Sequence, residues 1–354
     1  MKKKILISTG GSGGHVIPAT ILHDHLSETS EVIISTDKRG LKYLRNESYV
    51  IKIIDTPRLS NIFTLPINLI IILSQIIQSF FLLKEKKIEY LFSTGGYMSL
   101  PLILACKFTS TKIFLFEPNL VLGRVNKLFL NSCEKIFCYN DQLKNFPKNF
   151  GHKIIKINPL IRKEFYEIRE KKKQSEVFKI LIVGGSQGAA IFDDKLKNSI
   201  IKLSKKFPIK VIQQTNQKDI FTIQNFYLKN GVENFIFDYD ANFVNHVSQS
   251  DICITRAGAS TLAELSFLNV PFIAIPLPSS KDNHQFENAN FYLENNCCWI
   301  IEQKHLENNI EEVLKGILQN KTDFLQKKEN LKKLNYQNTW INVNQKIVST
   351  INEN

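Results

Sequence analysis

Motifs that commonly decide a protein's class are missing from this sequence. Its 6 cysteines form no CxxC pair, and no His/Cys spacing resembles a zinc site. Cysteines scattered without a framework are typical of a protein kept in a reducing cytosol. The N-terminus is basic, but its apolar run is too short for the hydrophobic region of a signal peptide. We therefore expect the first residues to form a strand.

Acidic residues are outnumbered by basic ones, 33 to 46, which leaves a formal net charge of +13. Such a charge suits nucleic acid, an anionic membrane surface or a phosphorylated substrate, and it does not choose among them. A hydrophobic content of 43% and a charged content of 22% are those of a globular protein and exclude a disordered chain. At 354 residues the chain exceeds one typical core, so two domains are expected.

A strand followed by a glycine-rich turn occurs once near the start of the chain and again near its middle. Residues 4–7 lead into Gly10-Gly11-Ser12-Gly13-Gly14, and residues 179–183 lead into Gly184-Gly185-Ser186-Gln187-Gly188-Ala189. A buried strand that turns through glycine into a helix is typical of the first βα unit of a doubly wound domain. The repeat predicts two similar domains, joined through the charged stretch 169–175.

Further strand-like runs alternate with helical stretches in both halves, which predicts an α/β fold twice over. The runs are residues 31–35, 90–93, 112–116, 210–213, 234–237, 251–255 and 271–276. Neither glycine loop matches GxGxxG, and no clear acidic residue follows the second strand at the position that binds a ribose. Both absences argue against a dinucleotide-dependent oxidoreductase.

Residues 65–83 are almost entirely Ile, Leu and Phe and are about long enough to span a bilayer. Gln75, Gln78 and Ser79 interrupt the run on one helical face, and three lysines follow within residues 84–87. Three interpretations stay open: a transmembrane helix, an ordinary core helix, and an amphipathic helix whose apolar face touches lipid while its lysines meet anionic headgroups. The last would also account for the positive net charge.

Four segments are suited to binding a phosphorylated ligand. In the first, consecutive glycines let backbone N–H groups approach a diphosphate, and the following helix offers its positive end. His15 at the mouth of that helix is either a general base or a histidine that caps the first turn. In the second, Ser186 places a hydroxyl where a phosphate oxygen can accept from it, although serine is also common in tight turns.

The third and fourth segments follow later strands. Residues 256–261 lead into a helix start with free N–H groups. Glu264 either completes a capping box with Thr261 or accepts from the ribose hydroxyls of a nucleotide. Residues 281–289 offer dense polar side chains to sugar hydroxyls, or form only a solvated loop. Residues 238–240 match a metal-binding DxD, but so short a pattern recurs by chance.

Taken in order, these motifs resemble those of the MurG family of bacterial peptidoglycan glycosyltransferases. The matching runs are Gly10-Gly11-Ser12-Gly13-Gly14-His15-Val16-Ile17-Pro18, Ser93-Thr94-Gly95-Gly96-Tyr97-Met98-Ser99-Leu100-Pro101, Glu117-Pro118-Asn119, Asn158-Pro159-Leu160-Ile161-Arg162, and residues 184–189, 256–264 and 282–289. They extend through most of the chain. Leu100 replaces a glycine of the family's second loop, and one extra residue precedes Arg162.

The resemblance implies the GT-B architecture, in which two Rossmann-like doubly wound domains face each other across a cleft. Residues 1–165 would form the acceptor and membrane-side domain, and residues 166–354 the UDP-GlcNAc-binding domain, with a last helix able to pack back on the first domain. A backbone contact to uracil would fall near Asp240. The other family contacts to the donor carry over to Ser12, Gly13, Gly14, Asn119, Arg162, Ser186, Ala259, Ser260, Thr261, Leu262, Ala263, Glu264 and Gln285.

The implied activity is that of an inverting N-acetylglucosaminyltransferase. It would move GlcNAc from UDP-GlcNAc to the 4-hydroxyl of undecaprenyl-diphospho-MurNAc-pentapeptide, as a peripheral protein on the cytoplasmic face of the cell membrane. His15 is the candidate base, Tyr97 and Gln285 position substrates, and in this context the ribose interpretation of Glu264 leads. Helix N-termini and Arg162 would stabilise the departing diphosphate. The resemblance implies no metal, no cofactor and no nucleic-acid partner.

Other functions share parts of this pattern. A different GT-B enzyme, such as a lipid galactosyltransferase or a UDP-sugar epimerase, has the same cleft and C-terminal nucleotide site. A nucleotide-binding protein without activity would bind UDP-GlcNAc and turn over nothing. Supplying UDP-GlcNAc with and without the lipid acceptor, and following UDP release, separates these alternatives.

Overall fold

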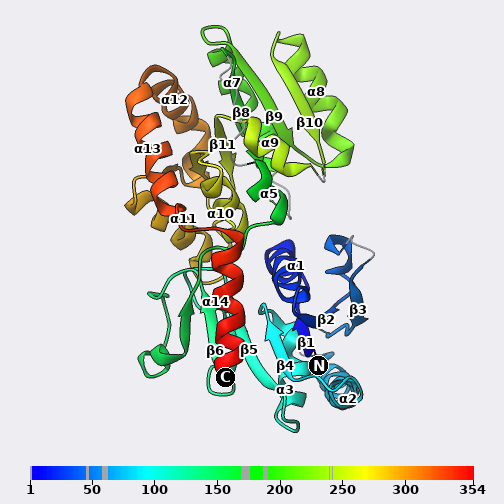
Figure 1. Ribbon diagram of the computed structural model, residues 1–354. Helices are drawn as coiled ribbons and strands as arrows, with labels where there is room; N and C mark the ends of the chain where they lie inside the picture. The colour runs from blue at the N-terminus through cyan, green and yellow to red at the C-terminus, as the bar shows by residue number, and fades with distance from the viewer. Residues whose placement is uncertain are drawn as a thin grey trace. The chain divides into compact units, whose positions relative to one another are not determined.

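The chain folds into two compact units, each built on its own parallel sheet. The computed structural model describes residues 2–44, 48–57, 63–168, 176–185, 190–238, 240 and 242–354. Unit 1 comprises Met1–Leu160 with Trp340–Asn354, and unit 2 comprises Ile161–Thr339. The α/β fold class and the two Rossmann-like domains expected from the sequence are confirmed (Figure 1).

The sheet of unit 1 is entirely parallel in its described pairs and runs in the order β3-β2-β1-β4-β5-β6-β7. Its strands are β1 Lys3–Ser8, β2 Ser30–Thr36, β3 Val50–Ile53, β4 Tyr90–Ser93, β5 Lys112–Glu117, β6 Lys135–Cys138 and β7 Ile154–Lys156. The helices are α1 Gly13–Ser27, α2 Leu65–Glu85, α3 Leu100–Cys106, α4 Arg124–Phe129 and α14 Trp340–Glu353, with short 3₁₀ turns η1 Leu41–Tyr43, η2 Tyr97–Ser99 and η3 Lys148–Lys153.

The strands of unit 1 read as nearly continuous apolar runs because helices cover both faces of the sheet. Ile5, Ile7 and Phe92 face one side, where they pack with α1 and α14. Leu6 and Leu91 face the other side, where they pack with α3 and the end of α2. The strand order reverses between β1 and β4, so the loops after these two strands flank the topological switch point.

Unit 2 repeats this plan with the strand order β10-β9-β8-β11-β12-β13. Its strands are β8 Phe178–Val183, β9 Ile209–Gln214, β10 Glu233–Phe237, β11 Ile252–Thr255, β12 Phe272–Ala274 and β13 Cys298–Ile300. Its helices are α5 Lys163–Ile168, α6 Ala190–Lys195, α7 Lys197–Ser204, α8 Ile220–Lys229, α9 Phe243–Gln249, α10 Ala259–Phe267, α11 His284–Glu294, α12 Leu306–Gln319 and α13 Lys321–Leu334. The switch point lies between β8 and β11, which places the loop after each of them at a candidate ligand site.

Most strands were predictable from sequence, whereas four short ones were not. The expected strands of both halves are all present as β1, β2, β4, β5 and β8 to β12. The missed strands β3, β6, β7 and β13 have only three or four residues each. β3 and β7 lie at the sheet edge with no fully buried residue, and Lys52 and Lys156 interrupt their short apolar runs, unlike those of the central strands.

The division between the units falls earlier than the expected 165/166. Ile161 and Phe165 are fully buried in the core of unit 2, so the chain enters that unit directly after Leu160. The last helix, α14, belongs to unit 1, where Val343 and Ile347 join the core beside α1. The predicted linker 169–175 lies outside the described residues.

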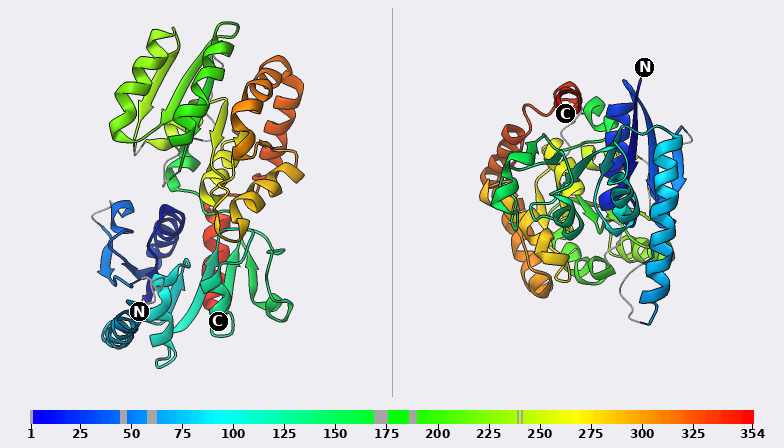
Figure 2. Two further views of the ribbon diagram at one scale, coloured as in Figure 1. Left: turned by 180° about the vertical axis from the view of Figure 1, so that it is seen from behind. Right: turned by 90° about the horizontal axis from the view of Figure 1, so that it is seen from below.

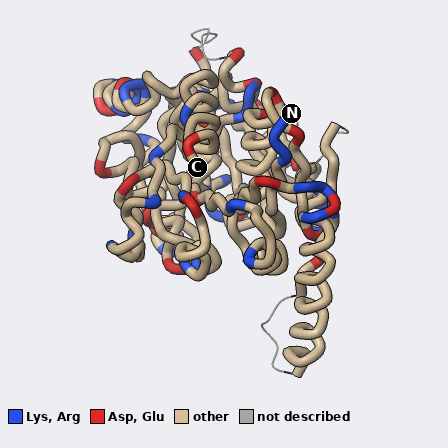
Figure 3. Tube along the Cα trace, turned by 60° about the horizontal axis from the view of Figure 1, so that its bottom comes forward, with Lys and Arg blue, Asp and Glu red and all other residues tan. Residues whose placement is uncertain are grey.

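Helix α2 carries its apolar side chains outward. Ile72, Ser79 and Leu83 are its only fully buried residues. Its large exposed side chains are Ile67, Leu69, Ile70, Ile71, Leu73, Ile77 and Phe81. The helix lies at the edge of unit 1, and its charged residues gather at one end (Figures 2 and 3). The interpretation as an ordinary core helix is therefore wrong, because a core helix buries this face.

Candidate functional site

His15 stands at the switch point of unit 1, in the first turn of α1. Its Nδ1 lies 2.7 Å from the carbonyl oxygen of Thr94, which follows β4. A carbonyl oxygen only accepts, so the neutral ring must carry its proton on Nδ1 and keep the lone pair on Nε2. The ring bonds to another loop rather than to the amides of its own helix. The structure thus argues against the helix-cap alternative for His15, and its role as a base stays a prediction.

Two glycines form the wall against which the imidazole rests. Gly95 and Gly96 have φ values of 88° and 84°, which favour glycine. A Cβ at Gly95 would lie 3.4 Å from His15 Cε1, and one at Gly96 would lie 3.6 Å from His15 Cδ2. Tyr97 follows directly, and its phenol oxygen accepts a hydrogen bond from Arg39. The loop with this glycine pair therefore contacts the His15 ring and also carries Tyr97.

A buried carboxylate holds the next loop of unit 1. Glu117 ends β5, and its Oε1 accepts from the backbone N–H and Nδ2 of Asn119 at 3.2 and 3.0 Å. Its Oε2 accepts from Gly123 N at 2.8 Å and Asn126 Nδ2 at 2.9 Å. Asn119, expected to touch the donor, is thus oriented by Glu117, to which the sequence pattern gave no role of its own.

The first glycine loop also brings Ser12 to the mouth of α1, as its N-cap. The side chain of Ser12 makes no capping hydrogen bond. Gly13 and Gly14 open the helix, and the first amides of a helix have no partner within it. These expected donor-binding residues therefore present a hydroxyl and two N–H groups at the positive end of a helix of 15 residues.

In unit 2, Glu264 pairs with Arg162. The Arg162 Nε donates to Glu264 Oε1 at 2.7 Å and Nη2 donates to Oε2 at 3.1 Å. Helix α10 begins with Gly258 as its N-cap, so Glu264 is not in a capping box with Thr261. Burial raises the pKa of the Glu264 carboxyl, and Arg162 opposes that rise. The capping interpretation is wrong, and both carboxylate oxygens face a cation.

The remaining residues expected at α10 divide by burial. Ala259, Ser260 and Thr261 are half-buried at the start of the helix. Leu262 and Ala263 lie in the core of unit 2, where their side chains pack under the sheet. A ligand at this helix can therefore meet the first three residues and the helix amides, whereas Leu262 and Ala263 position them from below.

Gln285, in the first turn of α11, is fixed by its amide oxygen. Oε1 accepts from Leu277 N at 2.9 Å and from Ala257 N at 3.3 Å, which ties α11 to the loops after β12 and β11. The Nε2 group has no hydrogen-bond partner among the described residues. Two N–H bonds of a fixed amide are thus left for a ligand hydroxyl or carbonyl.

Ser186 and Asp240 were expected to contact the donor, but neither can be shown here with a side chain available to it. Ser186 lies outside the described residues. Asp240 accepts from Asn242 N at 2.8 Å and pairs with His246 Nε2 at 2.7 Å. The hydrogen bond from Asn242 and then that from His246 hold the pKa of Asp240 below its ordinary value. Its carboxylate is engaged locally, so the Asp238-Tyr239-Asp240 pattern gives no support to a metal site.

Asp37 and Arg39 belong to none of the motifs from which the site was predicted. Asp37 directly follows β2, which is the position where a dinucleotide-binding domain carries its ribose acid. The expectation that no acidic residue stands there is therefore wrong. Both oxygens of Asp37 nevertheless accept from groups of the protein itself, Gly11, Gly40 and Arg39. The dinucleotide alternative remains disfavoured, now because the acid is occupied. The sequence feature that could have identified Asp37 is its position directly after the second strand.

Comparison with known proteins decides the family. The glycosyltransferase family 28 N-terminal domain matches residues 5–138, and the glycosyltransferase family 28 C-terminal domain matches residues 179–339. This chain belongs to glycosyltransferase family 28. The two domains correspond to units 1 and 2, and both glycine loops lie within the residues that they match.

Curated relatives match all or most of the chain. A UDP-N-acetylglucosamine--N-acetylmuramyl-(pentapeptide) pyrophosphoryl-undecaprenol N-acetylglucosamine transferase of Pelagibacter ubique is 48% identical over 100% of both chains. A relative of the same name from Rickettsia felis is 33% identical over 89% of this chain and 90% of its own. This family member is therefore a glycosyltransferase related over its whole length to enzymes of that name.

Solved structures support the fold. Acinetobacter baumannii MurG superposes with a TM-score of 0.78 at 22% identity, covering 100% of both chains. A UDP-GlcNAc 2-epimerase from Neisseria meningitidis, bound to UDP-GlcNAc, superposes with a TM-score of 0.65 at 14% identity over 99% of this chain and 100% of its own. At these identities the likeness shows the shared GT-B fold of transferases and epimerases.

Proposed function

We propose that this glycosyltransferase moves GlcNAc from UDP-GlcNAc to the 4-hydroxyl of a lipid-linked diphospho-MurNAc-pentapeptide, the reaction named in its full-length relatives. The identity of 48% without a gap in coverage supports the same substrates. The single observation that carries the mechanism is the fixed tautomer of His15, whose Nε2 lone pair is free to accept the proton of an attacking hydroxyl.

The nucleophile is the acceptor's 4-hydroxyl. It attacks the anomeric carbon of the donor from the face opposite the diphosphate, so the α-linked sugar of UDP-GlcNAc becomes β-linked and UDP leaves. His15 takes the hydroxyl proton as the new bond forms. The Thr94 carbonyl keeps the ring oriented and stabilises the imidazolium that results, since a doubly protonated ring donates more strongly from Nδ1.

The donor nucleotide is assigned to unit 2. The helix start at Ala259 provides amides for a diphosphate, and Glu264 and Arg162 supply opposite charges at the same place. A carboxylate accepts from ribose hydroxyls, and a guanidinium binds phosphate oxygens. In the unliganded chain these two groups satisfy each other, so donor binding exchanges their mutual hydrogen bonds for bonds to the ligand.

The decisive experiment is transfer of labelled GlcNAc. Purified protein is incubated with UDP-[¹⁴C]GlcNAc and a short-chain lipid-diphospho-MurNAc-pentapeptide, and radioactivity is followed into the lipid fraction. We expect label in the lipid product only when acceptor is present. An epimerase would instead convert UDP-GlcNAc without acceptor, and either that result or binding without turnover would refute the proposal.

We further propose that α2 docks unit 1 on an anionic membrane surface. The outward apolar face of α2 and the lysines that follow, Lys84, Lys86 and Lys87, are the pattern of a helix lying in the lipid interface. α2 is also long and apolar enough to cross a bilayer, with 11% of its most apolar window buried. Interfacial docking is favoured because Gln75 and Ser79 face unit 1, which leaves the helix one lipid-facing side.

A further inference from the structure

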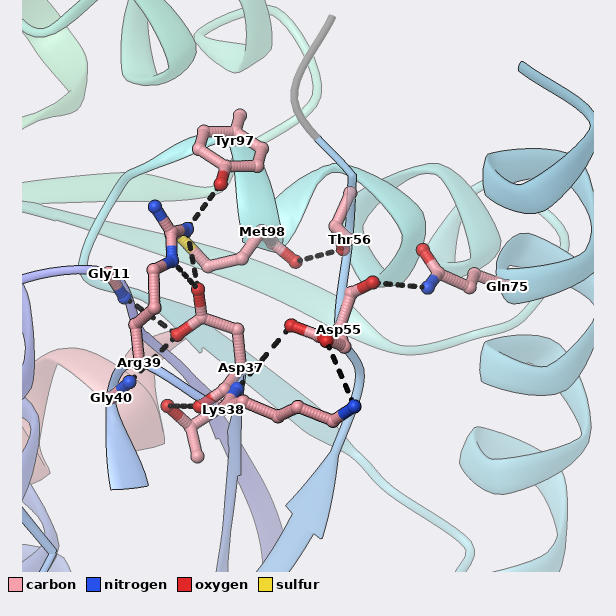
Figure 4. Close-up of polar contacts among 11 residues, drawn as sticks. Gly11, Asp37, Lys38, Arg39, Gly40, Asp55, Thr56, Gln75, Tyr97 and Met98 are labelled. Atoms are coloured by element: carbon pink, nitrogen blue, oxygen red, sulfur yellow. Dashed lines mark hydrogen bonds and ion pairs between the residues drawn. The ribbon is translucent and has the colours of Figure 1, made fainter. Parts of the chain in front are cut away.

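The carboxylate of Asp37 is an internal anion within the first glycine loop. Its side chain is 0% exposed. Oδ1 accepts from Gly11 N at 2.8 Å and from Gly40 N at 2.9 Å. Oδ2 accepts from Arg39, from Nε at 2.8 Å and from Nη2 at 2.5 Å (Figure 4). Two bonds to each oxygen satisfy the carboxylate without any ligand.

This arrangement limits what the loop can offer to a substrate. The amide of Gly11 points inward at Asp37, so it is not available to a phosphate. A Cβ at Gly10 would lie 2.7 Å from Asp37 Oδ1, which shows how closely the loop wraps the carboxylate. Of the glycine loop, a substrate phosphate is left with the amides of Gly13 and Gly14 at the start of α1, and its charge still requires a cation as complement.

Arg39 provides that complement. Its Nε and Nη2 are held by Asp37, and Nη2 also donates to the phenol oxygen of Tyr97. Nη1 has no hydrogen bond or ion pair among the residues that the structure describes. The side chain of Arg39 is 37% exposed. A guanidinium locked on one edge by a buried carboxylate has lost its rotamer freedom before any ligand arrives, which favours binding at its other edge.

We propose that Arg39 binds the diphosphate of the lipid-linked acceptor, with Asp37 as its brace and the Tyr97 hydroxyl beside it. This proposal rests on the proposed function, since it assigns one substrate of that reaction. Guanidinium groups bind phosphate oxygens through paired N–H donors, and the phenol that accepts from Arg39 keeps its own O–H free to donate.

The place of Arg39 favours the acceptor over the donor. Tyr97 follows the Gly95-Gly96 pair that lies against the His15 ring, so Arg39 bonds to the loop that contacts the proposed base. The muramoyl 4-hydroxyl and the diphosphate stand at opposite ends of one sugar ring. The loop of residues 95–97 therefore contacts both the base, which would act at one end of the ring, and Arg39, which would act at the other. The nucleotide has its own cation, Arg162, in unit 2.

A second chain of contacts links Arg39 to the proposed membrane helix. Gln75 of α2 donates to the backbone oxygen of Asp55 at 2.9 Å. The Asp55 carboxylate accepts from Lys38 N at 3.4 Å and lies 3.6 Å from Lys38 Nζ, directly before Arg39 (Figure 4). A prenyl diphosphate anchored in a bilayer carries its phosphates at headgroup level. Because Arg39 is connected to α2 by these contacts, it is suited to bind the phosphates of a lipid-linked substrate.

The test compares Arg39→Gln and Arg39→Lys with wild type in steady-state transfer to a short-chain lipid-diphospho-MurNAc-pentapeptide. We expect Arg39→Gln to raise the acceptor KM roughly 10- to 100-fold, the range for losing a hydrogen bond between charged groups, with donor KM unchanged. Arg39→Lys should raise it less, because it keeps the charge and loses the paired geometry. Lys42→Gln removes an exposed charge from the same segment and should leave both KM values at wild type.

A binding measurement separates this proposal from the activity itself. Calorimetry with farnesyl diphosphate and farnesyl monophosphate should show that wild type prefers the diphosphate and that Arg39→Gln loses the preference, whether or not transfer occurs. If wild type transfers GlcNAc but a folded Arg39→Gln keeps its acceptor KM, or weakens donor and acceptor equally, Arg39 is only a structural brace. Should Arg39→Gln fail to fold, an unchanged acceptor KM in Arg39→Lys overturns the proposal equally.

Discussion

At the scale of single residues, the site consists of side chains whose hydrogen bonds leave one group free. His15 bonds through Nδ1 and keeps Nε2, and Gln285 bonds through Oε1 and keeps Nε2. Arg39 bonds through Nε and Nη2 and keeps Nη1. Each residue is held by one edge and presents the other, which is what precise placement of a reacting group requires.

Replacement of His15 tests its role as base. His15→Ala should lower kcat roughly 10²- to 10⁴-fold, the range for general-base catalysis, while UDP binding stays at the wild-type value. His152→Ala, which removes an exposed histidine of the same unit, is the matched control. Rates from single-turnover transfer at saturating substrates report the chemical step. A His15→Ala rate close to that of wild type would remove the residue from this role.

Replacement of Glu264 tests the donor site. Glu264→Gln keeps the shape but removes the charge that pairs with Arg162, and an amide has one oxygen rather than two to accept from ribose hydroxyls. We expect the Kd for UDP to rise roughly tenfold or more with acceptor KM unchanged. Glu164→Gln is the control, because Glu164 faces the same guanidinium at 3.7 Å from a more exposed position. Equal effects of the two substitutions would assign Glu264 a structural role.

At the scale of secondary-structure elements, α2 departs from the usual pattern of a globular protein. An amphipathic helix of a soluble domain turns its polar face to water, whereas α2 turns Gln75 and Ser79 toward its own unit and most of its isoleucines outward. Contiguous exposed apolar surface of this kind marks a surface that another phase or partner covers. The three lysines at its end favour an anionic lipid surface.

Vesicle binding tests this element. Wild type should sediment with phosphatidylglycerol vesicles at low salt and less with neutral phosphatidylcholine vesicles, since Lys84, Lys86 and Lys87 add electrostatic attraction. The double variant Ile70→Glu and Phe81→Glu should stay in the supernatant, because it places charge on the apolar face. Phe221→Glu changes an equally exposed apolar residue of unit 2 and should sediment like wild type. Co-sedimentation of the double variant would argue against docking by α2.

At the scale of the whole molecule, the last helix returns to the first unit. His25 of α1 stacks on Trp340, the first residue of α14, with ring centroids 3.6 Å apart. Both nitrogens of His25 are buried without a hydrogen-bond partner among the described residues, and burial lowers the pKa of this histidine from 6.5 to about 3. The first helix and the last helix are thus in contact through a histidine that must stay neutral.

This contact predicts acid sensitivity of unit 1. The unfolded chain takes up a proton on His25 below about pH 6.5 and the folded chain does not, so stability is complete above that pH and falls as the pH drops toward 3. Between pH 7.5 and 5 the loss should be about 2 kcal/mol, which follows from about 1.36 kcal/mol per pH unit. His25→Phe keeps the stacking and should remove this loss.

Urea denaturation provides the measurement. The chain has 2 tryptophans, so in a Trp299→Phe background the fluorescence reports Trp340 alone and hence unit 1. His284→Phe in unit 2 serves as the control and should leave the pH dependence of the Trp340 signal unchanged. An equal loss of stability in wild type and His25→Phe between the two pH values would contradict the prediction.

The sequence by itself determined those features that depend on short contiguous runs of residues. The central strands and the glycine loops after β1 and β8 could be predicted because a strand buried on both faces has to be apolar along its length and a tight turn needs glycine. The order of the motifs indicated the family, and the family domains confirm it. His15, Gln285 and Glu264 were named as site residues on this basis.

The tertiary structure alone decided which group each side chain meets. Glu264 pairs with Arg162, 102 positions away, and Asp37 fills a loop 26 positions earlier in the chain. The sequence likewise did not decide which face of α2 points outward, because composition does not say whether a helix packs by its apolar or its polar side. Hydrogen-bond partners and burial depend on residues that only folding brings together. Local patterns therefore predict the helices and strands, whereas the tertiary structure sets the contacts that give each side chain its chemistry.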